Sequence, residues 1–395
     1  MAENKEKKVL NVPNLRFPEF QGEWKECKLG DIAMVVGGGT PDTNNHKYWN
    51  GDIQWFTPSE IGRDKYVTNS LRTISEEGLN KSSAKLLPIG TILLSSRATV
   101  GECSINKVEC TTNQGFQSLI TKEYFSKEFV FYLIQTKRKE LIRKSCGSTF
   151  LEISANEVRK IKIAVPTSKE QEKISKLLAL LDERIATQNK IIDKLQSLIK
   201  GISNRLLYAD NSMSIRIEEM LIERSERTKK NNQYEILSST VNGIFSQRDY
   251  FSKDIASDNN VGYKIIHLHD IVLSPQNLWM GNINFNDKFD IGIVSPSYKV
   301  FSIADGFDKK YVAALLKTHH ALYNYMLVSE QGASTVRRNL NYEAFEQLVF
   351  KIPSLNKQQE IGHVISLLKS QLENANLLIK TYNSQKQYLL RQMFI

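Results

Sequence analysis

The second half of the chain repeats the first, and this repeat restricts the possible folds more than any other feature of the sequence. The segment from Pro166 to Ile174 has a counterpart from Pro353 to Ile361, at an offset of 187 residues. A proline opens each segment and an isoleucine closes it, with a glutamine between them. An internal repeat of this length predicts two related structural units in one chain.

Each repeated segment continues as an amphipathic helix. Its apolar residues recur in alternating steps of four and three, the period of a helix that buries one stripe against a partner helix. Only Gln188 in the first stripe and Lys386 in the second clearly interrupt this pattern. Each helix spans about 40 residues, or roughly 60 Å. Because each stripe alone would expose a long apolar surface, we expect the two helices to pack on each other.

The residues expected to pair the helices are apolar members of the two stripes. They are Ile174, Leu178, Leu181, Ile185, Ile192 and Leu195 in the first helix and Ile361, Ile365, Leu368, Leu372 and Ile379 in the second. The alternative is two unrelated amphipathic helices, which would leave the shared offset and the shared Pro–Gln–Ile frame unexplained.

A weaker repeat precedes both helices. Ile92–Ser95 matches Ile271–Ser274, and Asn113–Leu119 aligns with Ser295–Val300. Short apolar runs bounded by turn residues predict β-strands joined by loops. The chain therefore divides into a globular domain at 1–165, a helix at 166–208, a second globular domain at 209–352 and a second helix at 353–395.

Composition excludes several classes of protein. The chain has 395 residues, enough for more than one core. No apolar run approaches the roughly 18 residues of a membrane span, and the charged N-terminus lacks the apolar region of a secretory signal. The four cysteines have no CxxC spacing, so neither a zinc site nor a disulfide framework is expected. These features predict a soluble cytoplasmic protein.

The net charge of +10 is unevenly distributed. The first globular domain and both helices carry the positive surplus, whereas the second globular domain is near neutral. A basic surplus suits a polyanionic partner without establishing one. The basic residues within 137–144 lie on a helix expected to begin near Lys127, where they form either a solvated face or a set of phosphate contacts.

Catalytic motifs are missing from the sequence. It has no GxxxxGK[ST] phosphate loop, no HExxH metal site and no adjacent prolines, which the Asn/Asp-Pro-Pro-aromatic motif of amino-methyltransferases requires. The acidic residues form no recognisable catalytic pair. The Gly37–Pro41 segment is interpreted as a tight loop, because a Pro–Asp turn follows it instead of a helix. We therefore predict a binding protein with no catalytic residue, metal or cofactor of its own.

Several segments together resemble the specificity subunits of type I restriction–modification systems. These segments are Leu15–Phe20, Trp24–Ile32, Gly38–Pro41, Tyr48–Ile61, Ser95–Gly101, Thr112–Leu119 and Pro166–Ile174. The second half lacks the Gly-Gly-Thr-Pro and Tyr-Trp-Asn-Gly segments and has no tryptophan that matches Trp24. Its recognition domain is therefore expected to be of a different type from the first.

The resemblance implies an α/β fold in which two long helices form an antiparallel coiled coil between two globular target-recognition domains, with an internal pseudo-twofold repeat. Each domain would read one half of a split, asymmetric site on double-stranded DNA, and the helices would act as a ruler that sets the gap. Partner modification subunits would bind S-adenosylmethionine and methylate adenine. Restriction subunits, which use ATP and Mg²⁺, would translocate and cleave. No catalysis is implied for this chain.

DNA contacts are expected from polar side chains in loops, because phosphate contacts position a protein and base-edge contacts specify sequence. The candidates in the first domain are Thr40, Asn44, Asn45, Lys47, Tyr48, Arg63, Lys65, Arg97, Thr99, Ser148 and Thr149. Those in the second domain are Arg248, Gln276, Asn277, Trp279, Ser334, Thr335, Arg337 and Arg338. For each single residue, an ordinary turn or solvated surface is the alternative. Trp49 and Trp55 are expected in the core.

Other functions remain open at this point. An autonomous DNA-binding protein would bind its site tightly without an enzyme partner. A coiled-coil scaffold with no DNA role would account for the stripes but would leave the loop motifs as coincidence. A self-sufficient methyltransferase or nuclease is disfavoured by the missing motifs.

Overall fold

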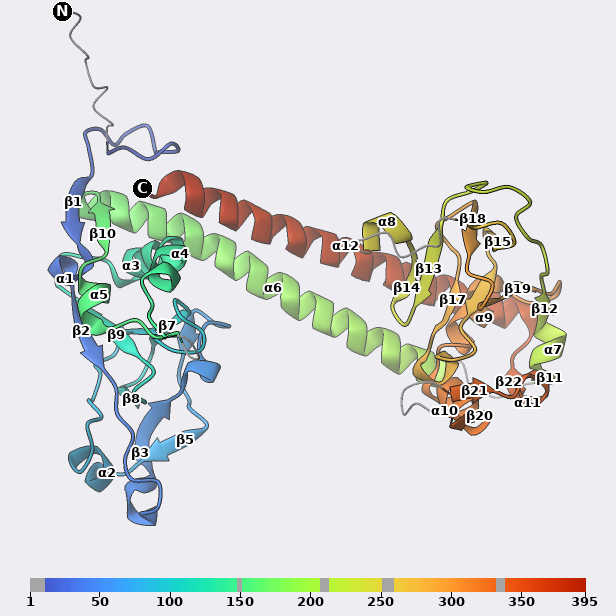
Figure 1. Cartoon of the computed structure of the whole chain (residues 1–395), viewed down its shortest axis with the longest axis horizontal. Helices are drawn as coiled ribbons and strands as arrows, with labels where there is room; N and C mark the ends of the chain where they lie inside the picture. The colour runs from blue at the N-terminus through green and yellow to red at the C-terminus, as the bar shows by residue number, and fades with distance from the viewer. Residues whose placement is uncertain (1–10, 148–150, 207–212, 251–258, 332–337) are drawn as a thin grey trace, which may run out of the picture. The chain divides into compact units, whose positions relative to one another are not determined.

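The computed structural model describes residues 11–147, 151–206, 213–250, 259–331 and 338–395. The chain forms two compact units, the first from residues up to 187 together with 378–395 and the second from residues 188–377. Two long helices, α6 (Ser168–Leu206) and α12 (Leu355–Met393), each contribute one part to each unit. Both units mix helices and strands (Figure 1), so the predicted α/β class with two long helices is confirmed.

Three groups of strands build the globular part of the first unit. The five-stranded sheet has the order β2-β9-β6-β7-β4, in which only β4 and β7 are parallel neighbours. The three-stranded sheet has the order β5-β3-β8, and β1 pairs with β10. The strands are β1 (Lys25–Lys28), β2 (Ala33–Gly37), β3 (Trp49–Phe56), β4 (Tyr66–Val67), β5 (Arg72–Ile74), β6 (Ile92–Leu94), β7 (Cys103–Asn106), β8 (Cys110–Thr112), β9 (Gln117–Thr121) and β10 (Lys162–Val165).

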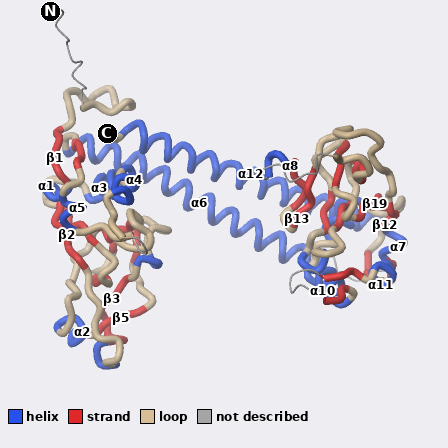
Figure 2. Tube along the Cα trace, in the orientation of Figure 1, coloured by secondary structure: helices blue, strands red, loops and turns tan. Residues whose placement is uncertain are grey.

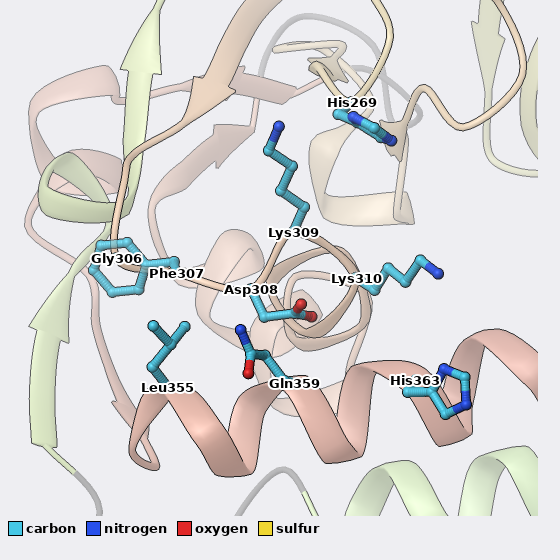
Figure 3. Close-up of a pocket in the computed structure, with 9 residues that line it drawn as sticks. All are labelled: His269, Gly306, Phe307, Asp308, Lys309, Lys310, Leu355, Gln359 and His363. Carbon is cyan, nitrogen blue, oxygen red and sulfur yellow. The ribbon is translucent and has the colours of Figure 1, made fainter.

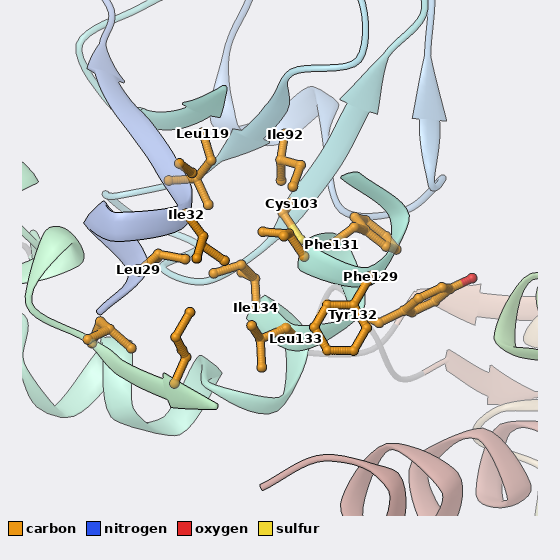
Figure 4. Close-up of a cluster of buried hydrophobic side chains, with 14 of the residues drawn as sticks. Leu29, Ile32, Ile92, Cys103, Leu119, Phe129, Phe131, Tyr132, Leu133 and Ile134 are labelled. Atoms are coloured by element: carbon orange, nitrogen blue, oxygen red, sulfur yellow. The ribbon is translucent and has the colours of Figure 1, made fainter. Parts of the chain in front are cut away.

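Short helices connect and cover these strands (Figure 2). They are α1 (Leu29–Ile32), η1 (His46–Tyr48), η2 (Pro58–Glu60), α2 (Glu76–Asn80), α3 (Lys127–Thr136), α4 (Arg138–Arg143) and α5 (Ala155–Arg159). The core is built around α3, in which all six residues from Phe129 to Ile134 are buried. They share one apolar cluster with Leu29 and Ile32 of α1 and with Ile92 and Leu119 of the five-stranded sheet (Figure 4).

The long helices run antiparallel within the first unit. Ile174 of α6 lies in one apolar cluster with Met393 near the end of α12, and Leu178 lies there with Leu390. Further along α6, Asp182 forms an ion pair with Lys386, with 2.7 Å between Oδ1 and Nζ. As residue numbers rise on α6, those of the partners on α12 fall. Lys386, which interrupts the apolar stripe, is thus neutralised, and a polar pair inside a helix interface favours one register over others.

The second unit repeats this plan with different strands. Its four-stranded antiparallel sheet has the order β12-β19-β16-β17, and the pairs β11-β22, β13-β14, β15-β18 and β20-β21 accompany it. The strands are β11 (Met213–Arg216), β12 (Leu221–Glu223), β13 (Leu237–Thr240), β14 (Gly243–Ser246), β15 (Lys264–His267), β16 (Ile271–Leu273), β17 (Ile283–Phe285), β18 (Ile291–Val294), β19 (Lys299–Ile303), β20 (Ser329–Gln331), β21 (Arg338–Leu340) and β22 (Val349–Ile352). The short helices are α7 (Ile217–Met220), α8 (Gln247–Tyr250), η3 (Leu278–Met280), α9 (Lys309–Leu315), α10 (His319–Leu327) and α11 (Tyr342–Glu346).

The long helices are also antiparallel within the second unit. Gln188, the other interruption of the stripes, donates a hydrogen bond from its Nε2 to the Ala375 carbonyl oxygen at 3.2 Å. Farther along α6, Ile202 packs on the apolar cluster that contains Ile361 and Ile365 of α12. Both interruptions of the stripes therefore have hydrogen-bonding or ionic partners on the opposite helix.

The predicted helix-pairing residues have the burial that such packing requires. Ile174, Leu178, Leu181, Ile192, Ile361 and Ile365 are buried. Ile185, Leu195, Leu368, Leu372 and Ile379 are partly buried. Helix α12 is also anchored at its end, where the rings of Phe394 and Phe129 stack with centroids 5.2 Å apart.

The glutamine shared by the two repeats performs the same task in both units. Gln171 accepts a hydrogen bond from the Ser126 backbone N–H at 3.0 Å and donates one to the Pro166 carbonyl oxygen at 3.0 Å. Gln358 accepts from the Asp308 backbone N–H at 3.1 Å and donates to the Pro353 carbonyl oxygen at 2.9 Å. Ser126 and Asp308 cap α3 and α9. Each buried amide therefore ties the start of a long helix to the start of a core helix.

One anchoring network belongs to the first unit alone. The Glu170 carboxylate accepts hydrogen bonds from Arg16 at 2.8 and 2.7 Å and from the Trp24 indole N–H at 3.2 Å. The counterpart of Glu170 in the second repeat is Lys357, which cannot accept these bonds. The first unit therefore fixes the segment before β1 in a way that the second unit does not share.

Among the residues that the structure describes, no helix combines the length and the apolar character needed to cross a membrane.

Replacing Lys386 with methionine is expected to destabilise the first unit by about 2 kcal/mol, because Asp182 would keep its charge in a partly buried helix interface without its cation. Lys380→Met is the matched control, since Lys380 lies exposed on the same helix and has no ion pair in the described structure. Urea unfolding followed by circular dichroism measures both variants. Equal midpoints for the two would show that the pair contributes nothing to the interface.

Candidate nucleic-acid interface

Loops of the first unit that are far apart in the sequence gather at one surface. The Gly39 backbone N–H donates to the Thr112 carbonyl oxygen at 2.8 Å, and the Ser96 N–H donates to the Gly115 carbonyl oxygen at 2.8 Å. The Thr99 hydroxyl donates to the Pro58 carbonyl oxygen at 3.5 Å. These bonds join loops 38–45, 57–60, 95–101 and 113–116, which we call the loop cluster. Loops on a rigid sheet are a common setting for binding residues.

Two glycines allow the loops to approach so closely. A Cβ atom on Gly38 would collide with the Thr112 and Asn113 carbonyl oxygens, and one on Gly39 would collide with the backbone of Ser83 and Ala84. Neither position leaves room for a side chain. The sequence interpretation of 37–41 as a tight loop agrees with this geometry.

Two buried tryptophans fix loop 38–45 of the loop cluster by hydrogen bonds from their indole N–H groups. The Trp55 indole N–H donates to the Gly39 carbonyl oxygen at 2.9 Å, and the Trp49 indole N–H donates to the Asp42 carbonyl oxygen at 3.1 Å. Their rings meet edge to face with centroids 5.0 Å apart. Both rings are buried, as expected from the sequence, and they fix loop 38–45 through its backbone.

The predicted DNA-contact residues of loop 38–45 and helix η1 differ in their exposure to solvent and in their hydrogen bonds within the protein. The side chains of Asn44 and Lys47 are exposed, whereas those of Thr40, Asn45 and Tyr48 are partly buried. Asn45 is engaged, because its Oδ1 accepts a hydrogen bond from the Lys47 N–H and caps η1. The Thr40 hydroxyl bonds to the Gln114 side chain across the loop cluster. Asn44 and Lys47 are therefore the predicted residues here that are freest to meet a ligand.

Other predicted residues of the first unit are divided between the loop cluster and the surface around it. Arg97 and Thr99 lie in the loop cluster, and Arg97 faces Glu152 with 2.9 Å between Nε and Oε1. Arg63 is exposed outside the loop cluster. Ser148 and Thr149 lie outside the described residues.

Lys65 is not part of the loop cluster. Its ammonium group donates to the Tyr132 hydroxyl at 2.9 Å, and that hydroxyl donates to Asp182 of α6 at 2.6 Å. The ammonium also lies 4.5 Å from the centroid of the Tyr132 ring. Desolvation lowers the pKa of Lys65 and raises the pKa of Tyr132. Lys65 therefore joins the globular part to α6, and its role as a DNA contact stays a prediction.

Four of the predicted residues in the second unit lie together beside η3. The Arg338 N–H donates to the Gln276 carbonyl oxygen at 3.2 Å, which places β21 against the loop that contains Asn277. The Arg338 guanidinium carbon is 4.8 Å from the centroid of the Trp279 ring. The Trp279 indole N–H is buried and has no acceptor in the structure as described. Arg248 is exposed on α8, and Ser334, Thr335 and Arg337 lie outside the described residues.

A buried amide network next to this group was not foreseen from the sequence. Asn282 accepts from the Ser239 hydroxyl at 2.8 Å, and Asn284 donates to the Thr240 carbonyl oxygen at 2.7 Å, which joins the β13–β14 hairpin to β17. Lys317 donates to Asn284 Oδ1 at 2.6 Å. Desolvation, with a further contribution from Lys369, lowers the pKa of Lys317 to about 8. Isolated asparagines in a sequence carry no signal for such a network, because it depends on strand pairing.

A cavity of about 580 Å³ lies between α9 and α12 within the second unit (Figure 3). Its charged and titratable lining is mostly basic, with Lys309, Lys310, His269 and His363 against one carboxylate, Asp308. That carboxylate caps α9 by accepting from the Tyr311 N–H at 2.8 Å. None of the predicted site residues that the structure describes lines this cavity.

The described residues offer no obvious metal or thiolate chemistry. No group of three or more His, Cys, Asp or Glu side chains in the described ranges is placed to hold a metal ion. All four cysteines are unpaired, and burial raises the pKa of Cys103 and of Cys110 to about 12. These two thiols therefore stay protonated at neutral pH.

The sequence of the first unit is similar to that of a known protein family. Residues 21–197, which make up less than half of the chain, match the model of the type I restriction modification DNA specificity domain. The matched segment contains the loop cluster, the core around α3 and the first part of α6.

Curated relatives carry the same designation. The specificity subunit of the type I restriction enzyme MjaIX from Methanocaldococcus jannaschii is 38% identical over 180 residues, which cover 44% of this chain and 42% of the relative. The specificity subunit of EcoR124I/EcoR124II from Escherichia coli is 32% identical over 175 residues, which cover 42% of this chain and 43% of the relative. The similarity therefore spans less than half the length of these relatives.

Solved structures extend the likeness of fold to nearly the whole chain. The S subunit of a type I restriction-modification system from M. genitalium matches with a TM-score of 0.63 at 13% identity, and the match covers 97% of this chain and 99% of that one. A chain from a study of the assembly and conformational transition of the type I R-M system matches with a TM-score of 0.56 at 13% identity, covering 93% and 96%. At this identity the likeness establishes the fold, which is that of a type I S subunit.

Gly39→Ala is expected to displace the loop cluster and to lower the stability of the first unit by about 1–3 kcal/mol, because the new Cβ would collide with the backbone of Ser83 and Ala84. Gly37→Ala is the matched control in the same unit. A Cβ at Gly37 would meet only the Gln117 side chain, at 3.9 Å, so this change should leave the stability of the first unit nearly unchanged. Thermal unfolding compares the two variants. A Gly39→Ala protein as stable as the parent would disprove the tight packing of loop 38–45.

Proposed function

We propose that the chain is the DNA sequence-specificity subunit of a type I restriction–modification complex. In this proposal each globular part reads one half of a split, asymmetric site on double-stranded DNA. The first unit uses the loop cluster, and the second uses the group around η3 together with Arg248. The chain itself carries out no catalysis and holds no cofactor, in keeping with relatives that are named for specificity.

The observation that carries the proposal is the loop cluster. Segments around positions 40, 58, 97 and 114 come together at one surface inside the part of the chain that matches the DNA specificity domain model. They present amide, hydroxyl and basic side chains, the groups that bond to phosphates and base edges. The alternative of a coiled-coil scaffold gives no reason for this assembly of polar loops.

The long helices suit the role of a spacer. Each has 39 residues, which corresponds to about 58 Å. One turn of DNA measures about 34 Å, so a helix pair of this length is able to separate two half-sites by more than one turn. The two half-sites are expected to differ, because the two globular parts differ in their strands and loops.

Catalysis is assigned to partners in this proposal. Modification subunits bind S-adenosylmethionine and methylate adenine at the site that this chain selects. Restriction subunits, using ATP and Mg²⁺, translocate and cleave DNA that lacks the methyl groups. The complex works in the cytoplasm, where its DNA lies, and the four unpaired cysteines suit that reducing setting.

Whole-genome mapping of adenine methylation tests the proposal. The chain and its neighbouring modification subunit are expressed together in a host without methylation, and the modification subunit alone is the control. A new split, asymmetric motif is expected only when the chain is present. If both proteins are soluble and associated but no motif arises, the proposal fails, and specific DNA binding by the purified chain would then separate an autonomous binder from a scaffold.

A further inference from the structure

Arg72, the first residue of β5, is stacked on a tryptophan at the surface of the first unit. Its guanidinium carbon lies 3.6 Å from the centroid of the Trp49 ring and 5.5 Å from that of the Trp55 ring. The arginine is exposed, whereas Trp49 and Trp55 are only 8% and 4% exposed. The guanidinium therefore rests on a buried platform, and it belongs to a residue that is exposed to solvent.

The platform beneath Arg72 is rigid. The two indoles meet edge to face at 5.0 Å, and each indole N–H is bonded to a backbone carbonyl of loop 38–45. Trp49 and Trp55 both belong to β3, the strand that pairs with β5. A planar group stacked on such a surface loses little conformational freedom when it binds a ligand.

The donors of this guanidinium are unused. Within the described structure it has neither an ion pair nor a hydrogen bond, although the Arg72 carbonyl oxygen accepts from the Ser70 hydroxyl at 2.7 Å. Other arginines of the same unit do have carboxylate partners, such as Arg97 with Glu152 and Arg138 with Glu102. Arg72 thus combines a fixed plane with free donors, the combination that suits a planar pair of acceptors.

We infer that Arg72 determines specificity by bonding to the O6 and N7 acceptors of a guanine in the half-site read by the first unit. The inference rests on the proposed function and adds a residue that the sequence patterns did not select. Guanine presents both acceptors on its major-groove edge, and the bidentate fork of arginine fits them in one plane. A lysine has the charge but not the fork, so it would not replace Arg72 here.

A similar stack occurs independently in the second unit. The Arg338 guanidinium carbon lies 4.8 Å from the Trp279 ring, although Arg338 also donates to the Met326 carbonyl oxygen at 3.4 Å. Arg72 begins β5 and Arg338 begins β21. These two strands are not equivalent positions of the internal repeat. Each globular part therefore presents an arginine oriented by an indole.

The test uses the complex with the modification subunits and proceeds from the methylation motif of the parent chain. Arg72→Lys and Arg72→Ala are expected to accept other bases at one guanine of one half-site, with discrimination reduced about 10- to 100-fold and the other half-site unchanged. Arg184→Ala is the matched control, because Arg184 is an exposed arginine of the same unit, on α6, with no aromatic ring beneath it in the described structure. Its loss should leave the motif intact.

A second measurement identifies the contact itself. Fluorescence anisotropy compares binding to duplexes in which single guanines are replaced by 7-deazaguanine, which lacks the N7 acceptor. One replacement should weaken the parent complex about tenfold and leave the Arg72→Ala complex unaffected. Tryptophan fluorescence and the unfolding midpoint identify variants whose platform is disturbed, and Arg72→Lys retains the cation over the rings.

Several results would overturn the inference. They are a motif without guanine, an unchanged motif in both folded variants, and a uniform loss of binding at all sequences that lysine restores, which would mark a phosphate contact. If the parent chain directs no motif at all, the proposed function fails instead. The two failures are therefore distinguishable in the same experiment.

Discussion

Burial of the apolar stripes on α6 and α12 is the constraint on which the structure depends. Two helices of 39 residues with long apolar stripes are unstable alone in water, so each must cover the other. In each unit the helices meet antiparallel, and the polar interruptions Gln188 and Lys386 are matched by partners across the interface. Because an unmatched polar group in such an interface costs free energy, these pairs also disfavour other registers.

Some contacts that join the globular parts to the long helices occur in both units, and others occur in one unit. Gln171 and Gln358 make the same two hydrogen bonds in their own units, so the docking of a core helix on a long helix is common to both. The Glu170 network with Arg16 and Trp24 has no counterpart among the described residues of the second unit. The shared contacts hold a core helix against a long helix in the same way in both units. The strands and loops around them differ, so the two globular parts present different surfaces.

How far the sequence predicts this structure depends on the range of the interactions. The long helices, predicted at 166–208 and 353–395, are found at Ser168–Leu206 and Leu355–Met393, because helical periodicity is a local signal. The strands predicted at Ile92 and Ile271 are also found, because a short apolar run bounded by turn residues is likewise a local signal. The pairing of β3 with β5 is not local, so Arg72 gave no signal although it lies on Trp49. The bond between Lys65 and Tyr132 also gave no signal in the sequence, because it joins residues 67 positions apart.

The distribution of charge suggests how the two proposed recognition surfaces divide their work. The first unit and the helices hold the positive surplus, whereas residues 209–352 are near neutral. Phosphate contacts supply affinity without sequence information, so a neutral surface must obtain its binding from a few directed contacts. In the proposed function, those contacts of the second unit would centre on Arg338, whose guanidinium lies over the Trp279 ring. Orientation of a donor fork by an indole would then compensate for the missing charge, because a preorganised side chain loses less entropy on binding.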